Sequence, residues 1–215
     1  MFGGSRPELM RLLLLRHPCR GPFAQKPGIP GKSRPMADCW GVRVKVLGEI
    51  LTCSLADSRS EQRKLWAAEV VERNIPVVSL LSIFDSGDQT AQRFMWLLGD
   101  VCERDPDRIA ECLPILFSLR NEMPFPGMPR SVAKWLMLTG VPEELEPAAS
   151  RQLLKWIRNP DSSIACKSYS ARAVISLVKS NRLGTARVRS ALATQLDHEN
   201  RSYANRIRKL IERLD

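Results

Sequence analysis

The sequence predicts an all-α fold, a right-handed α-α superhelix (solenoid) of about five antiparallel helical hairpins. The first observation is an internal repeat: Gln62-Arg63-x-x-Trp66 recurs as Gln92-Arg93-x-x-Trp96, and the match continues to Val71 and Val101. An offset of about 30 residues is typical of stacked helical hairpins, which bury their apolar faces against their neighbours. The second is that apolar residues follow a helical period from Trp40 onwards. The third is the lack of Asn-Gly or Asp-Gly turns between alternating strands.

Turn-forming residues divide this pattern into hairpins. Asp57-Ser58 separates the first pair of helices, and Asp85-Ser86-Gly87-Asp88 separates the second pair, whose leading helix has Pro76 at its first turn. Pro124-Phe125-Pro126-Gly127 divides the third pair, and Gly140 ends it because glycine adopts a left-handed conformation at low cost. The helices predicted for these hairpins are Val42–Cys53 and Ser60–Arg73, Val77–Phe84 and Gln89–Glu103, and Asp107–Leu119 and Pro129–Thr139.

Two further hairpins complete the chain. Pro147 suits a first helical position, and Asn159-Pro160-Asp161-Ser162 connects the two helices of the fourth hairpin. The last helix carries a single apolar stripe with charged residues elsewhere, as expected for a helix that caps one end of a solenoid. The stripe consists of Tyr203, Ile207, Leu210, Ile211 and Leu214. The helices predicted here are Pro147–Arg158 and Ser163–Lys179, and Thr185–Leu196 and Arg201–Leu214.

Shorter motifs also recur. Ser168-Tyr169-x-x-Arg172 reappears as Ser202-Tyr203-x-x-Arg206. An Asp-Ser pair precedes the second helix of three hairpins, where a short polar side chain can cap the first backbone N–H groups. The three pairs are Asp57-Ser58, Asp85-Ser86 and Asp161-Ser162. Together these motifs indicate degenerate two-helix repeats.

The fourth hairpin resembles a known repeat family. Residues 153–161 read Leu-Leu-Lys-Trp-Ile-Arg-Asn-Pro-Asp and are followed by Ala171-Arg172-Ala173-Val174. An apolar helix, a Pro-Asp turn and a second helix rich in Ala and Arg resemble a HEAT repeat of the armadillo type. The resemblance implies a HEAT-like domain over residues 36–215 that binds protein, nucleic acid or another ligand. It implies no active site, because the family carries no universal one.

The basic charge is concentrated before this domain. Residues 1–35 contain seven Lys and Arg and one Glu, which is +6 of the formal net charge of +10. The remaining +4 is ordinary for a folded domain. Three interpretations of residues 1–35 stay open: sequence upstream of a true start at Met36, which we favour, a disordered basic tail, or a targeting segment.

Few residues suit chemistry. The chain has two histidines, His17 and His198, and six scattered cysteines, and it lacks nucleotide-binding, dinucleotide-binding and zinc-protease motifs. We therefore expect no cofactor and no metal, and reduced thiols in a cytoplasmic protein. No apolar run approaches the roughly 20 residues of a membrane span, so we expect no membrane partner.

Binding residues are expected on the second helix of each hairpin, which tends to line the concave surface of HEAT-like solenoids. Basic side chains off the apolar stripes could form a positive groove there, although an ordinary solvated helix face stays open as the alternative. Trp66, Trp96 and Trp135 could form an aromatic ladder, or could fill the core between stacked hairpins. The candidate binding residues are Arg63, Arg93, Trp96, Arg130, Lys134, Trp135, Arg172 and Arg206, and the basic stripe extends to Lys179 and Arg208.

Two functions are compatible with this sequence. The first is a non-enzymatic interaction or scaffold module that binds a protein or acidic partner in the concave groove. The second is suggested by similarity in size, helical content and basicity to alkylpurine DNA glycosylases built from HEAT-like repeats. Trp96 and Asp100 could act in such a DNA-binding protein, although no family motif matches residue by residue.

Overall fold

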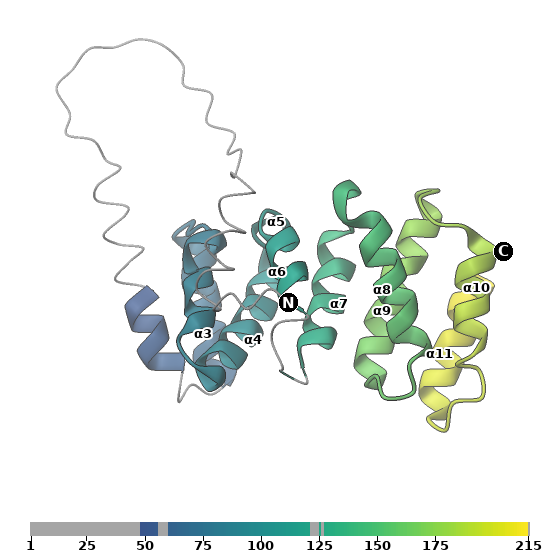
Figure 1. Cartoon of the computed structure of the whole chain (residues 1–215). Helices are drawn as coiled ribbons and strands as arrows, with labels where there is room; N and C mark the ends of the chain where they lie inside the picture. Colours follow the sequence, from purple (N-terminus) through teal and green to yellow (C-terminus); the bar gives the residue numbers. More distant parts are fainter. Residues whose placement is uncertain (1–47, 56–59, 121–124, 126, 215) are drawn as a thin grey trace, which may run out of the picture. The chain divides into compact units, whose positions relative to one another are not determined.

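The computed structural model describes residues 48–55, 60–120, 125 and 127–214. Within these ranges the chain forms helices and turns and no strand, which confirms the predicted all-α class (Figure 1). The predictions for residues 1–35 and for Asp57-Ser58 lie outside the described residues. The chain divides into two compact units, Met1–Leu97 and Leu98–Asp215, and the division falls inside one helix, α4.

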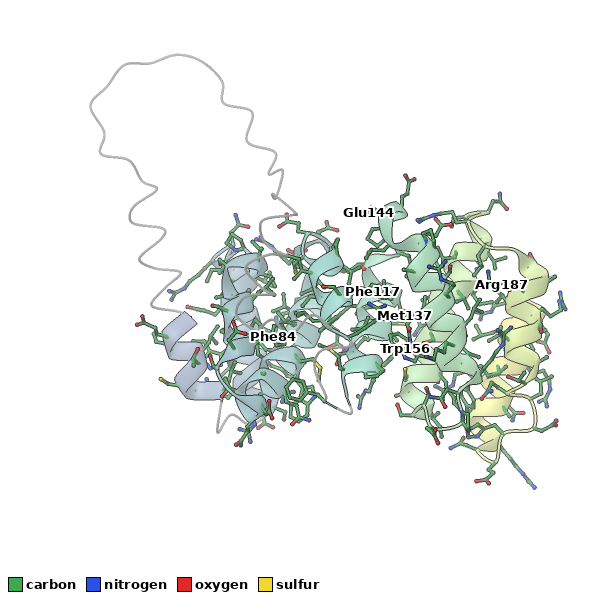
Figure 2. The ribbon with its side chains drawn as sticks, viewed as in Figure 1. Phe84, Phe117, Met137, Glu144, Trp156 and Arg187 are labelled. Carbon is green, nitrogen blue, oxygen red and sulfur yellow. The ribbon has the colours of Figure 1, made fainter. Side chains whose placement is uncertain are left out.

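The first unit contains helical residues 48–55, α3 (Ser60–Glu72), the 3-10 helix η1 (Val77–Asp85) and the beginning of α4 (Asp88–Arg104). The predicted helix Val77–Phe84 is therefore present, but it has 3-10 geometry. The rings of Phe84 and Phe94 pack edge to face with centroids 4.9 Å apart, and both side chains are fully buried. Figure 2 labels Phe84 among the helices of this unit. This aromatic pair joins η1 to α4 in the core of the unit.

The predicted helix Asp107–Leu119 is wrong in one respect, because the structure has two short helices in its place. They are α5 (Pro106–Ala110) and α6 (Leu113–Leu119). Pro114 lies in the first turn of α6. Its ring would clash with the carbonyl of residue 110, and it has no N–H to donate to that carbonyl, so a continuous helix breaks there.

The remaining helices of the second unit match the prediction closely. They are α7 (Met128–Thr139), α8 (Glu146–Arg158), α9 (Ile164–Lys179), α10 (Thr185–Ala193) and α11 (Arg201–Glu212). The short 3-10 helix η2 (Glu143–Leu145) before α8 was not predicted. Gly140 ends α7 with φ 81° and ψ 170°, a conformation that only glycine adopts without strain, as the sequence predicts. The helix α10 ends three residues before the predicted Leu196, in a series of turns.

Side-chain caps begin the two helices that are most important below. The Oδ1 atom of Asn200 accepts a hydrogen bond from the backbone N–H of Tyr203 at 2.9 Å, at the start of α11. The Oγ atom of Ser163 accepts from the N–H of Cys166 at 3.2 Å, at the start of α9. The predicted cap at Asp161-Ser162 is therefore wrong by one residue, because these residues belong to the preceding turn.

Helix α9 lies at the centre of the second unit. It packs against α7, α8, α10 and α11, whereas α8 and α11 each also contact α10 (Figure 1). Small buried residues on α9 allow this close approach: Ser170, Ala171 and Ala173 are each at most 1% exposed. The helices α9 and α11 thus pack against each other, and both also pack against α10.

Candidate functional site

A pocket lies between α9 and α11 in the second unit, with a cavity volume of about 280 Å³. Side chains of α9 form one wall, and side chains of α11 with Arg213 just after it form the other. Tyr203 and Ile207 are each 1% exposed and form the floor, while the basic side chains are exposed. The lining residues are Ser168, Tyr169, Arg172, Tyr203, Arg206, Ile207, Lys209, Leu210 and Arg213.

Both copies of the Tyr-x-x-Arg motif meet in this pocket. Tyr169 and Arg172 come from α9, and Tyr203 and Arg206 come from α11. Residues three apart lie on the same side of a helix, so each motif presents a tyrosine and an arginine to the same surface. Because α9 and α11 pack together, the internal repeat brings two such pairs into one site.

Four cationic side chains line the pocket, Arg172, Arg206, Lys209 and Arg213. No Asp or Glu is among the described residues that line it. Within the described part of the chain, the side chains of Arg172, Arg206, Lys209 and Arg213 make no ion pair or hydrogen bond. Other basic residues of the same unit do: Arg182 Nε lies 2.6 Å from Glu146 Oε2.

The sequence around the pocket also has a large excess of positive charge. Residues 162–214 contain eleven Lys and Arg and three Asp and Glu, which is a formal charge of +8. Helix α9 contains no acidic residue, and α11 contains only Glu212. A concave site lined by one sign of charge attracts ligands of the opposite sign. The pocket is therefore suited to an anionic ligand.

The floor of the pocket carries no charge. Burial and, to a lesser extent, the nearby Cys166 thiol raise the pKa of the Tyr203 hydroxyl to about 12. Tyr203 is therefore a neutral phenol at physiological pH. Burial likewise raises the pKa of Cys166 to about 11, so this thiol is not a nucleophile at neutral pH. Among the described residues, the hydroxyls of Tyr203 and Ser168 are buried without a hydrogen-bond partner.

The other candidates of the second unit do not line the pocket. Trp135 is fully buried and serves as a core residue, so it cannot contact a ligand from this position. Lys134 Nζ lies 2.7 Å from Glu103 Oε1, and this ion pair neutralises its charge. Arg130 is exposed in the first turn of α7. Of the extended stripe, Arg208 Nη1 donates to Asn205 Oδ1 at 2.6 Å, and Lys179 is exposed at the end of α9.

The candidates of the first unit form a separate cluster. The guanidinium of Arg63 lies over the ring of Trp96, 5.4 Å from its centroid, and Trp96 is 40% exposed. This cation–π contact joins the first copy of the repeat to the second. Arg93 Nη1 donates a hydrogen bond to the backbone carbonyl of Leu55 at 3.1 Å. Arg93 thus helps to hold α4 against helical residues 48–55. Trp96 is an exposed aromatic side chain among the described residues of this unit.

Several residues of the pocket were not predicted from the sequence. Lys209 and Arg213 were not among its candidates, nor were the two tyrosines, because the helical stripe assigned Tyr203 to the core. Two signals could have found them. The Tyr-x-x-Arg repeat pointed to both walls of the pocket, and the charge of residues 162–214 is much higher than the average over the domain.

The described residues that line the pocket include no Asp, Glu, His or Cys side chain. In the part of the chain that the structure describes, no three His, Cys, Asp or Glu residues come together to hold a metal ion. Over the same residues, no helix combines the length and apolar character needed to cross a membrane.

Comparisons of the chain with protein-family models, with curated proteins and with solved structures gave no match.

Proposed function

We propose that this protein is a non-enzymatic interaction module whose second unit binds an acidic protein segment on the basic surface of α9 and α11. The observation that carries this proposal is the pocket with four cationic side chains and no acidic one. Clustered like charges repel one another, and a bound carboxylate relieves this repulsion while it gains charge-assisted hydrogen bonds.

We also propose that the second unit is a HEAT-like stack of hairpins. The contacts between helices support this proposal. Helix α9 packs against both α7 and α11, and α8 packs against α10, so the helices form two rows. The two helices of each hairpin, α8 with α9 and α10 with α11, pack against each other and connect the rows. Helix α9 also contacts α10 of the next hairpin, and such contacts between successive hairpins are typical of stacked helical repeats. In such a stack α9 and α11 are the second helices of their hairpins, where a HEAT-like protein carries its binding surface.

An acidic protein segment suits the pocket better than duplex DNA does. Non-specific DNA binding depends on many phosphate contacts spread along a wide surface. Here the unpaired cations surround one pocket of about 280 Å³ with a buried floor of Tyr203 and Ile207. This arrangement favours a side chain that enters the pocket over a smooth phosphate backbone.

The test is a binding titration with a fluorescent acidic peptide, Glu-Asp-Glu-Leu-Glu-Asp-Glu, followed by anisotropy. The double variant Arg172→Ala/Arg206→Ala is expected to weaken binding by at least about tenfold, since hydrogen bonds to charged groups contribute about 1.5–3 kcal/mol each. Both residues are exposed, so the melting temperature of the variant should change by a few degrees at most.

A matched control removes the same charge elsewhere. Lys155→Ala/Arg158→Ala deletes two exposed cations of α8 that do not line the pocket. This control should retain most of the affinity. Equal losses in the two double variants would contradict a specific site. Tighter binding of duplex DNA than of the peptide, with the steep salt dependence of phosphate neutralisation, would support the alternative of a DNA-binding protein of the alkylpurine DNA glycosylase type.

A further inference from the structure

The pocket separates charged from apolar surface. Its cations, Arg172, Arg206, Lys209 and Arg213, are all exposed and form the rim. Beneath them, Tyr203 and Ile207 are almost completely buried, and Tyr169 and Leu210 are partly exposed between rim and floor. A carboxylate or phosphate bound at the rim would leave this apolar interior filled with water.

The pocket has room for a large apolar side chain. A volume of about 280 Å³ is slightly below the roughly 300–1,000 Å³ that is usual for pockets that enclose a small-molecule ligand. A leucine or phenylalanine side chain can enter such a pocket and exchange water for contact with Tyr203, Ile207 and Leu210. Burial of apolar surface is the favourable contribution that the cations alone do not provide.

The pocket is also elongated along α11. Its lining residues on that side run from Tyr203 to Arg213, a distance of about 15 Å at the helical rise of 1.5 Å per residue. An extended peptide of roughly five residues has the same length. Arg206 and Arg213 lie on either side of Leu210 along this wall, and Arg172 faces them from α9. A peptide that inserts its middle side chain would thus place its flanking residues against cations in both directions.

On the basis of the proposed function, we infer that the pocket recognises an acidic segment with one large apolar anchor residue flanked by Asp or Glu on both sides. The anchor fills the space over Tyr203 and Ile207, and the flanking carboxylates pair with the arginines and the lysine of the rim. This arrangement separates selectivity from charge: the rim attracts acidic segments in general, and the floor selects those with a suitable anchor.

The experiment uses the full-length wild-type protein and a series of peptides that differ only at the central position. Glu-Asp-Glu-Leu-Glu-Asp-Glu is compared with the same peptide carrying Phe, Ala or phosphoserine in place of Leu. We expect the Leu and Phe peptides to bind at least about tenfold more tightly than the Ala peptide, because the anchor side chain buries most of its apolar area.

A protein variant tests the same contact from the other side. Leu210→Ala removes a partly exposed side chain of the pocket wall and should retain the fold. It should weaken binding of the Leu peptide severalfold and leave the Ala peptide almost unchanged, since the Ala peptide does not contact Leu210. Equal losses for the two peptides would contradict an anchor at this wall.

The peptide series distinguishes a failure of the anchor from a failure of the proposed function. If the Leu and Ala peptides bind equally well and both depend on Arg172 and Arg206, the anchor is wrong and the proposed function stands. If the phosphoserine peptide binds more tightly than the Leu peptide, the pocket is a phosphate site and the anchor is again wrong. If no acidic peptide binds, the proposed function itself fails.

Discussion

Three tryptophans share one position of the sequence repeat but have three different environments. Trp66 is partly buried, Trp96 is 40% exposed beside Arg63, and Trp135 is fully buried. The sequence left a core role and a ligand-facing role open for all of them. For Trp135 the structure supports the core role, whereas Trp96 presents an aromatic face to solvent. Equivalence in a repeat therefore does not imply an equivalent role.

This difference predicts the effects of substitution. Trp135→Ala should lower the free energy of unfolding by about 3–5 kcal/mol, because it leaves a large cavity in a closely packed core. Trp135→Phe should cost less, since it refills most of the space and removes an indole N–H that has no partner among the described residues. Urea denaturation followed by circular dichroism measures both. Trp96→Ala is the control, and a loss as large as that of Trp135→Ala would contradict the assignment.

Three buried groups predict a loss of stability in alkaline solution. Burial is the main cause that raises the pKa of Cys102 to about 12, of Cys166 to about 11 and of Tyr203 to about 12. A group whose pKa is higher in the folded state contributes stability that is fully present below its unfolded pKa. That contribution is lost as the pH rises, because the unfolded chain then releases a proton that the folded chain retains.

The free energy of unfolding should therefore decline from about pH 8.5 towards pH 12, a range set by the ordinary pKa of cysteine and the raised values. Urea denaturation at a series of pH values tests this. The double variant Cys102→Ala/Cys166→Ala should be less stable than wild type near neutral pH, because of its cavities, but should decline less steeply above pH 9. Parallel curves for the two proteins would show that the thiols are not the cause.

At the scale of the helix, the start of α11 positions one wall of the pocket. The side chain of Asn200 caps α11 through the N–H of Tyr203, which itself lies in the pocket floor. Asn200→Ala should lower the free energy of unfolding by about 0.5–2 kcal/mol, because it leaves an N–H at the helix end without a partner. Asn205→Ala, an exposed substitution in the middle of the same helix, is the matched control and should be nearly neutral. Similar losses in the two variants would contradict the capping role.

The presence of most helices was predictable from the sequence, but the residues at which they begin and end were less predictable. Apolar periodicity located α7, α8, α9 and α11, because apolar residues recur along each of them at the helical period. The break between α5 and α6 was missed although Pro114 predicts it, since its apolar neighbours Leu113, Ile115 and Leu116 continue a helical pattern across the proline. The cap at Ser163 was missed because a Ser or Asp one residue earlier has the same propensity.

The pocket was only half predictable. Arg172 and Arg206 were identified because they lie off the apolar stripes, and the structure brings them to the same cavity. Lys134 was an equivalent candidate by sequence, but its pairing with Glu103 depends on how α7 packs, which no local pattern specifies. Tyr203 belongs to a predicted apolar stripe and also forms the pocket floor. Local periodicity indicates that such a residue faces inward, and it does not indicate that a cavity lies beside it.

At the scale of the whole molecule, the average charge conceals the site. The sequence after residue 35 carries a formal charge of only +4, yet residues 162–214 carry +8. Acidic residues elsewhere cancel the excess; Figure 2 shows one of them, Glu144 in η2, pointing away from the ribbon. Electrostatic attraction of a partner depends on the local field at the pocket, since surface charges more than about 10 Å away are largely screened at physiological ionic strength.

The most direct test of the central claim, that an acidic segment binds between α9 and α11, is to locate the bound peptide. Amide chemical shifts of the isotope-labelled full-length protein are recorded while the Leu-anchored acidic peptide is titrated. We predict saturable shift changes confined to α9, α11 and their immediate neighbours, and their loss in Arg172→Ala/Arg206→Ala. Changes centred on Trp96 in α4, or small unsaturable changes at every basic helix, would contradict the claim.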